Sequence, residues 1–187
     1  MKEFFEMLNS IYPLSTGLQE QLLLTLKTQT LAKKKLLLKE GEICKSVYFI
    51  QKGLVRCFYN HHSKEVSSWF MKEGDLIISV ESFFKQKASY ESIQVLEDCT
   101  IIGIQYDELQ EMYKRFSELN FIARVLTENY YTLSEQCLYS IRMMRAPERY
   151  KYLRNNFSEL IQRVPSKYLA SYLSVSEETF SRIKSMI

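Results

Sequence analysis

The hydrophobic and polar positions divide the chain into three stretches. Apolar residues recur three or four apart over residues 1–27, which predicts two helices separated at Pro13. From about 28 to 105, short runs of β-branched and aromatic residues alternate with turn signals such as Lys52-Gly53 and Glu97-Asp98. Five or more strands at about ten-residue spacing predict an antiparallel sandwich or barrel. From about 106 onward the helical pattern returns.

A long helix is predicted between Glu118 and Met144, a stretch without Gly or Pro. Along this helix, positions alternately three and four residues apart are mostly apolar, and three of them are polar. Such a seam is typical of two parallel helices that pair with each other. We expect this seam to make a homodimer interface that includes Leu119, Ile122, Leu126, Asn129, Leu133 and Gln136. The alternative is that the same face packs on the chain's own sandwich.

Ala146-Pro147-Glu148 ends the long helix and marks a domain boundary. Three short helices are expected after it, at about 148–161, 165–173 and 176–186. The last two are separated by a turn at Ser174-Val175 and predict a helix-turn-helix, because the final helix turns its apolar residues inward. Its outer side would then carry Glu177, Glu178, Ser181, Arg182 and Ser185. The alternative is an ordinary helical hairpin with an exposed Glu–Arg pair.

The charge is unevenly distributed. The 187-residue chain has a formal net charge of +3. Residues 144–187 contain eight basic and four acidic residues, so this segment is +4 and the rest of the chain is −1. A basic C-terminal segment on a near-neutral body is expected when a sensor is joined to a DNA-binding domain. A solvated basic face is the other interpretation.

Several other classes of protein fit the sequence poorly. No apolar run approaches the roughly 18 residues of a membrane helix, and the N-terminus lacks a signal-peptide core, so we expect a cytoplasmic protein without a membrane partner. The only histidines are His61 and His62, too few for a catalytic triad or a metalloenzyme site. We therefore expect no enzyme, no metal and no cofactor. Reduced, buried thiols are expected for the four widely spaced cysteines, Cys44, Cys57, Cys99 and Cys137.

Several fragments in order resemble the Crp/Fnr family, the regulators similar to the catabolite activator protein. SEETFSR is similar to the family's recognition-helix signature, KEGDLI resembles the start of its phosphate-binding cassette, and LLLKEGEICKSVYFIQKGLVRCFYN resembles its second-to-fourth strand region. The resemblance covers nearly the whole chain. It implies an α+β fold with a β jelly-roll effector domain at 1–117, a dimerisation helix at 118–145 and a helix-turn-helix domain at 146–187.

The resemblance also assigns roles to residues of the last helix. Glu178 and Arg182 would read bases, and Glu177 would make a further base or backbone contact. Ser176 and Thr179 would approach phosphates. Charge and placement add two more DNA contacts, at Lys167 and Lys184.

The cassette departs from the family pattern. Gly74 and Asp75 match its start, but Ser79 stands where a ribose-binding Glu is expected, and Ser89-Tyr90 stand where a phosphate-binding Arg and its neighbour are expected. No Arg occurs between Arg56 and Arg115. We expect these five cassette residues to line an effector pocket that does not bind cyclic AMP, because a buried phosphate would lack a guanidinium partner.

A further departure is that no β-hairpin wing is evident after the last helix or before it. The function implied by the whole sequence is a homodimeric transcription regulator that binds palindromic double-stranded DNA under the control of an unknown small-molecule effector, with RNA polymerase as a further partner to consider. The alternative is a ligand-binding or protein-interaction module that has lost DNA binding, which the missing wing and the acids at 177 and 178 favour.

Overall fold

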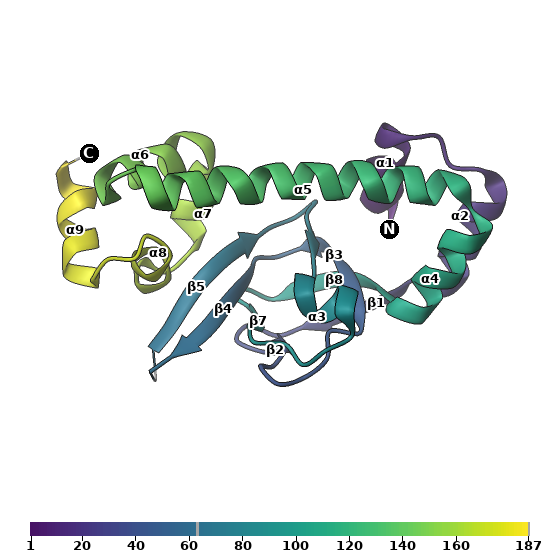
Figure 1. The fold of residues 1–187 in the computed structure, drawn as a ribbon, viewed down its shortest axis with the longest axis horizontal. Helices are drawn as coiled ribbons and strands as arrows, with labels where there is room; N and C mark the ends of the chain where they lie inside the picture. Colours follow the sequence, from purple (N-terminus) through teal and green to yellow (C-terminus); the bar gives the residue numbers. More distant parts are fainter. Residues whose placement is uncertain (63, 187) are drawn as a thin grey trace.

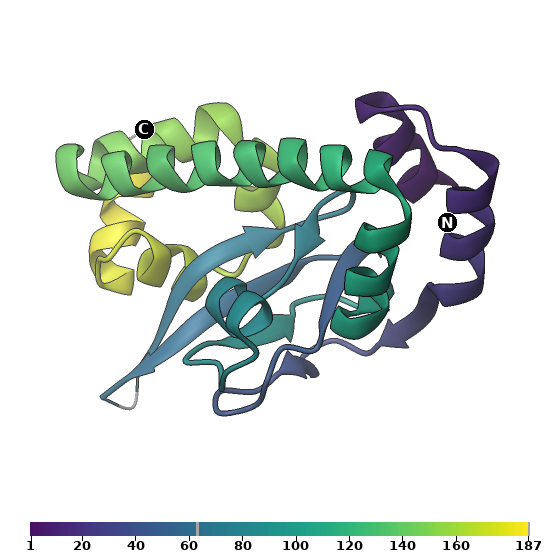
Figure 2. The same cartoon turned by 45° about the vertical axis from the view of Figure 1, so that its right-hand side comes forward.

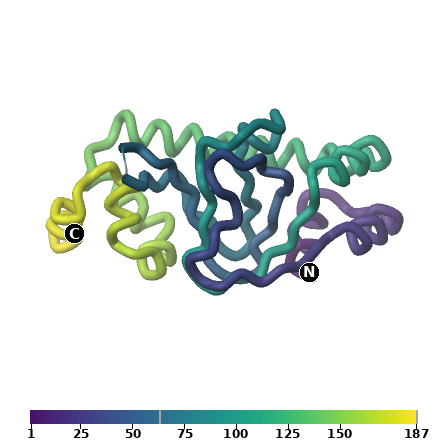
Figure 3. Tube along the Cα trace, turned by 90° about the horizontal axis from the view of Figure 1, so that it is seen from below, coloured from purple at the N-terminus to yellow at the C-terminus, as the bar shows by residue number. Residues whose placement is uncertain are grey.

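A computed structural model describes residues 1–62 and 64–186 of the chain. Its longest element is α5 (Ser117–Met143), a helix of 27 residues along which the other elements are arranged. The helices α1 (Lys2–Ile11), α2 (Thr16–Thr25) and α4 (Tyr106–Arg115) lie at one end, the strands lie in the middle, and the C-terminal helices lie at the other end (Figure 1). The view from below shows the same order (Figure 3).

The middle part is a sandwich of two four-stranded antiparallel sheets, with strand orders β1-β8-β3-β6 and β2-β7-β4-β5. This is the strand order of a jelly roll. The strands are β1 (Lys27–Leu31), β2 (Leu36–Leu38), β3 (Ser46–Lys52), β4 (Val55–His61), β5 (Lys64–Met71), β6 (Leu76–Ile77), β7 (Ser92–Val95) and β8 (Cys99–Gln105).

The predicted strand-rich region is confirmed, and so are the two N-terminal helices around Pro13. The sequence pattern did not resolve the short strands β1, β2 and β6, nor the six-residue helix α3 (Val80–Lys85) between β6 and β7. A single core fills the sandwich and continues into the N-terminal helices, with buried residues such as Leu18, Phe49 and Ile101. Helices and strands therefore fold as one packed unit around the jelly roll.

The first turns of α5 belong to this same core. Leu119 and Ile122 are buried, Ile122 with none of its surface exposed, and Leu126 packs against the core beside them. The expectation that Leu119 and Ile122 contact a second protomer is therefore wrong, because their side chains are already covered by their own chain. The alternative interpretation, a face packed on the chain's own sandwich, holds at these two positions. Further along, Leu133 faces the C-terminal helices, whereas Gln136 lies at the edge of that contact and is exposed, as is Asn129.

The long helix ends before Pro147, as expected, and the chain continues as α6 (Ala146–Asn156), which has this proline in its first turn. Four helices follow α5 rather than the expected three, because the first predicted helix is interrupted at Phe157. The others are α7 (Ser158–Arg163), α8 (Ser166–Tyr172) and α9 (Glu177–Met186).

A second hydrophobic core lies under these helices. It gathers Tyr150, Leu169, Phe180 and neighbouring residues, and it includes Leu54, Phe70 and Leu96 from the strands. The C-terminal helices are thus packed on the jelly roll, mainly through α8 against β5. Figure 2 shows the β4–β5 hairpin running beneath α5 beside them.

Candidate nucleic-acid interface

Helices α8 and α9 are joined by the short segment 173–176. Ser174 takes a left-handed conformation with a φ of 56°, which reverses the chain, and the Val175 amide donates to the Ala170 carbonyl at 3.0 Å. The Ser176 hydroxyl then accepts from the Thr179 amide at 3.1 Å and so caps α9. The turn and the cap expected from the sequence are therefore at the expected residues.

The inner side of α9 is fixed by aromatic and aliphatic packing. Phe180 is only 2% exposed, and its ring lies edge-on to that of Tyr150, with the centroids 5.4 Å apart. Ile183 is buried in the same core, and Ala170 of α8 is buried where the two helices approach each other. Because α9 cannot rotate without losing this packing, its outer face has a defined orientation.

That outer face is polar and open. Glu177, Glu178 and Arg182 are exposed, together with Ser181, Lys184 and Ser185. The Arg182 guanidinium lies 4.0 Å from the Glu178 carboxylate, and the two side chains are 69% and 84% exposed. Such an exposed pair is weak, at roughly 0–1 kcal/mol, so either side chain can turn to another partner. Thr179 is half-buried, and Lys167 is exposed on α8 with its ammonium over the Tyr168 ring.

The other side of α8 meets the jelly roll at Arg56, which the sequence did not single out as functional. Arg56 has no exposed surface; its guanidinium lies 3.6 Å from the Tyr168 ring centroid and 4.1 Å from that of Phe58. Nη2 donates to Glu65 at 2.6 Å and to Gln94 at 2.9 Å. This arginine therefore faces α8 and is unavailable to the interior of the sandwich.

Arg163 of α7 makes a second link between the C-terminal helices and the jelly roll. Its guanidinium donates to both carboxylate oxygens of Glu73 and of Glu97, over 2.7–3.1 Å, and also to Glu159 at 2.8 Å. Glu73 and Glu97 lie in turns of the jelly roll, so one side chain holds α7 on two of its loops. Hydrogen bonding to Arg163 lowers the pKa of Glu73 from 4.5 to about 2.

We expect Arg163→Gln to lower the free energy of unfolding by about 1–2 kcal/mol at pH 7, since the network is partly exposed. The pKa of Glu73 is depressed in the folded state, so this stabilisation is present above 4.5 and is lost as the pH falls towards 2. Urea unfolding of both proteins at pH 7 and near pH 2.5 measures the difference. A deficit of equal size at both pH values would contradict the role given to Glu73.

The predicted effector residues fall into separate groups in the structure. Ser79 and Ser89 are buried with their hydroxyl oxygens 2.9 Å apart, while Tyr90 is 54% exposed and stacks on Tyr59 outside them. Gly74 and Asp75 lie in the β5–β6 turn, where Gly74 has a φ of 90° and Asp75 accepts from the Lys72 amide. This turn contacts α5 rather than the two serines.

Glu91 is the functional-site candidate that the sequence analysis missed. Its side chain is buried beside Ser79 and Ser89, and burial raises the pKa of its carboxyl. The neighbouring titratable groups are the buried thiols of Cys44 and Cys57 and the phenols of Tyr59 and Tyr90. An acid thus lies beside Ser89, the position at which the family resemblance expects the phosphate-binding Arg.

We expect Glu91→Gln to raise the stability of the protein at neutral pH. The pKa of Glu91 is higher in the folded than in the unfolded state. The stability that the protonated carboxyl contributes is therefore fully present below the unfolded-state pKa and is lost as the pH rises through the folded-state pKa. The wild type should therefore lose stability relative to the variant as the pH rises above 4.5, the usual pKa of a glutamic acid. Urea unfolding from pH 4.5 upward measures the difference, and curves that stay parallel would show that Glu91 does not titrate as described.

Cysteine and histidine chemistry adds no further site. All four cysteines are free and Cys44, Cys57 and Cys99 are buried, as expected, while Cys137 is half-buried. The ring centroids of His61 and His62 lie 4.2 Å apart. Within residues 1–62 and 64–186, no cluster of three potential metal ligands occurs, and no helix is long and apolar enough to cross a bilayer.

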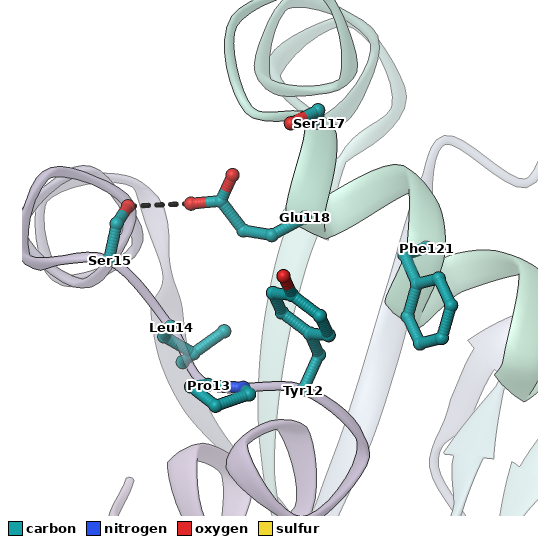
Figure 4. Close-up of a pocket in the computed structure, with 7 residues that line it drawn as sticks. All are labelled: Tyr12, Pro13, Leu14, Ser15, Ser117, Glu118 and Phe121. Carbon is teal, nitrogen blue, oxygen red and sulfur yellow. Dashed lines mark hydrogen bonds between the residues drawn. The ribbon is translucent and has the colours of Figure 1, made fainter.

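An open hollow lies at the other end of α5, between its first turns and the α1–α2 connection (Figure 4). The Ser15 hydroxyl donates to the Glu118 carboxylate at 2.5 Å across it. Tyr12 and Phe121 present exposed rings there, with centroids 5.2 Å apart. The hollow therefore offers an apolar surface next to the outer side of α5 rather than a set of reactive groups.

Comparison with known proteins agrees with this architecture. Residues 28–116 match the family of the cyclic nucleotide-binding domain. The jelly roll is therefore similar to this domain over that part of the chain. No curated protein sequence is similar enough to count as a match.

Solved structures with a similar fold include regulators of the Crp/Fnr family. FixK2 from Bradyrhizobium japonicum is 16% identical, with a TM-score of 0.72 over 86% of this chain and 83% of that one. The global regulator CLP from Xanthomonas campestris is 15% identical, with a TM-score of 0.69 over 92% and 91%. The catabolite activator protein of Thermus thermophilus is 18% identical, with a TM-score of 0.56 over 94% and 84%. At these identities the likeness concerns the fold, and the neighbours are regulators rather than enzymes.

Proposed function

We propose that this chain is a sequence-specific DNA-binding transcription regulator that binds a palindromic duplex as a homodimer. The observation that carries the proposal is the outer face of α9, where Glu178 and Arg182 are exposed on a helix whose inner side is fixed by Phe180 and Ile183. The two helices α8 and α9 with their capped turn are the parts of a helix-turn-helix, which places its second helix in the major groove.

The roles follow from the chemistry of the exposed groups. Arg182 can bind the O6 and N7 of guanine bidentately, and the Glu178 carboxylate can accept from cytosine N4. Glu177 lies beside them for a further base or backbone contact. Ser176 and Thr179, at the start of α9, and the ammonium groups of Lys167 and Lys184 are placed to contact phosphates.

The dimer needs a different face of α5 from the one first predicted, because Leu119 and Ile122 are buried. Positions with alternating spacings of four and three residues continue along the outer side of the helix, which is the repeat of a paired-helix seam. Asn129 and Gln136 remain in this seam, with Tyr139 and Met143 exposed by 59% and 68%. We define the outer seam as Val125, Asn129, Thr132, Gln136, Tyr139 and Met143.

A contact between the cassette and α5 offers a route for control by an effector. The Leu76 amide, one residue after the Gly74-Asp75 turn, donates to the Tyr130 hydroxyl at 2.8 Å. A ligand that moved this turn would therefore move α5, and with it the outer seam and the spacing of the two α9 helices. The buried Glu91 argues that such an effector is not cyclic AMP.

Selection of bound duplexes from a random pool tests the proposal. We expect enrichment of a palindrome whose half-sites are about 34 Å apart, one turn of DNA. The alternative function, a ligand-binding or protein-interaction module without DNA binding, is favoured by the acidic pair Glu177 and Glu178 on the α9 face. It predicts no enrichment, even with protein shown to be dimeric by light scattering.

A further inference from the structure

A partly enclosed cavity of about 160 Å³ lies where α5, β5 and the C-terminal helices meet. Its walls come from both parts of the molecule: Trp69 lies on β5, Leu133 on α5, and Tyr152, Phe157 and Tyr172 on the C-terminal side. The lining is predominantly apolar and aromatic. It contains the chain's single tryptophan.

The guanidinium of Arg149 in this lining has a nitrogen without a hydrogen-bond partner. The Arg149 guanidinium donates to the carbonyl oxygens of Met144 at 2.8 Å and Leu173 at 2.5 Å, but its Nε is buried without a hydrogen-bond partner. Among the described residues no carboxylate forms an ion pair with Arg149. The lining has one acid, Asp75, which accepts from the Lys72 amide of its own turn.

We propose that this cavity binds a small ligand with one aromatic ring and one carboxylate, the carboxylate facing Arg149. A cavity of about 150 Å³ holds a benzene molecule, so this one fits a single ring with a small substituent. Flat aromatic walls match such a ring. A carboxylate would supply the charge-assisted acceptor that Arg149 lacks.

The location of the cavity gives the ligand a regulatory effect, and this consequence rests on the proposed function. Because the walls belong to both the jelly roll and the C-terminal helices, the site is complete only while the two are docked. A ligand that binds the docked arrangement stabilises it by mass action. It therefore biases the position of α9 relative to the rest of the chain.

The fluorescence of Trp69 tests the binding step without DNA. We expect benzoate to change the emission saturably, with a Kd of about 1 mM or tighter. Benzamide should bind at least about tenfold more weakly, because it has no charge for Arg149, and benzylamine should not bind. Equal titration by all three compounds, or no saturable change with benzoate, would overturn the proposal.

Variants of the full-length protein separate the cavity from nonspecific effects. Ser140→Leu should abolish binding because it fills the cavity from α5, and Arg149→Gln should weaken it about tenfold or more. Arg142→Gln, an exposed α5 residue outside the lining, is the matched control and should bind like the wild type. Circular dichroism confirms that each variant is folded, and benzoate binding that survives Ser140→Leu would contradict the site.

A separate experiment tests whether ligand binding regulates DNA binding. It measures how benzoate changes the affinity of the protein for a duplex that the wild type selects. We expect at least a threefold change that is absent in Ser140→Leu. Benzoate binding with unchanged DNA affinity would overturn the regulatory consequence alone. A failure of DNA selection with intact benzoate binding would overturn the proposed function and leave the ligand site standing.

Discussion

Arg182→Ala weakens binding to the selected palindrome by about 30-fold or more. A good bidentate contact between arginine and guanine discriminates by about 1–3 kcal/mol, and a dimer makes the contact twice. Arg182 is 69% exposed and its only ion-pair partner in the described chain is Glu178, so its removal leaves the fold of the C-terminal helices intact. Fluorescence anisotropy with a labelled duplex at fixed salt measures the loss.

The matched control for this prediction is Arg115→Ala. It removes the same charge from an exposed arginine at the far end of α5, where the guanidinium contacts Gln21 and Phe116. We expect its DNA affinity to stay within about twofold of the wild type, since distant surface charges are screened at physiological salt. Equal losses for the two variants would indicate attraction by net charge rather than recognition by α9.

Phe180→Ala is expected to destabilise the C-terminal helices by about 3–5 kcal/mol, the usual cost of removing a buried phenylalanine side chain. The ring of Phe180 is 2% exposed and fills the space between α9 and Tyr150 of α6. Without it the outer face of α9 loses its fixed orientation, so DNA binding should fall as well. Thermal and urea unfolding, followed by near-ultraviolet circular dichroism, measure the change.

Phe84→Ala provides the comparison, because Phe84 is 56% exposed on the jelly roll. We expect its free energy of unfolding to change by less than about 1 kcal/mol. If Phe180→Ala were no more destabilising than Phe84→Ala, the packing that orients α9 would not be the packing described.

The alternation and periodicity of the sequence predicted most elements correctly. Strands with several β-branched or aromatic residues between turn signals were found, as were the long helix and the short helices after Pro147. The missed strands β2 and β6 have three and two residues, too short for a pattern to show, and β1 is mostly polar and exposed, so it shows no alternation of apolar and polar positions. The break between α6 and α7 at Phe157 could not be predicted, because no proline or glycine lies there.

The face of α5 shows why periodicity alone could not place the dimer. A stripe of apolar residues predicts burial, but it does not say whether the covering surface belongs to the same chain or to a second one. Here Leu119 and Ile122 are covered by the chain's own core, and the outer seam is less apolar, with Thr132 and Tyr139 among its members. Only the spatial arrangement of the sandwich separates the two faces.

The effector region could be predicted in part. The sequence shows directly that no arginine lies between Arg56 and Arg115. Glu91 was overlooked, although the strand pattern around it indicates that its side chain is buried. In the run ESIQVL, Glu91 alternates with Ile93 and Val95, so strand periodicity places its side chain on the buried face. The links made by Arg56 and Arg163 join residues up to 112 positions apart in the sequence, and no local pattern predicts such pairs.

Parallel selections from a random duplex pool with the wild type and Arg182→Ala show whether α9 reads the DNA sequence. We predict that the wild type enriches a palindrome and that the variant loses the preference for one guanine in each half-site, with weaker enrichment overall. If Arg182→Ala enriched the same palindrome with the same preference at every position, a surface other than the α9 face would be reading the DNA.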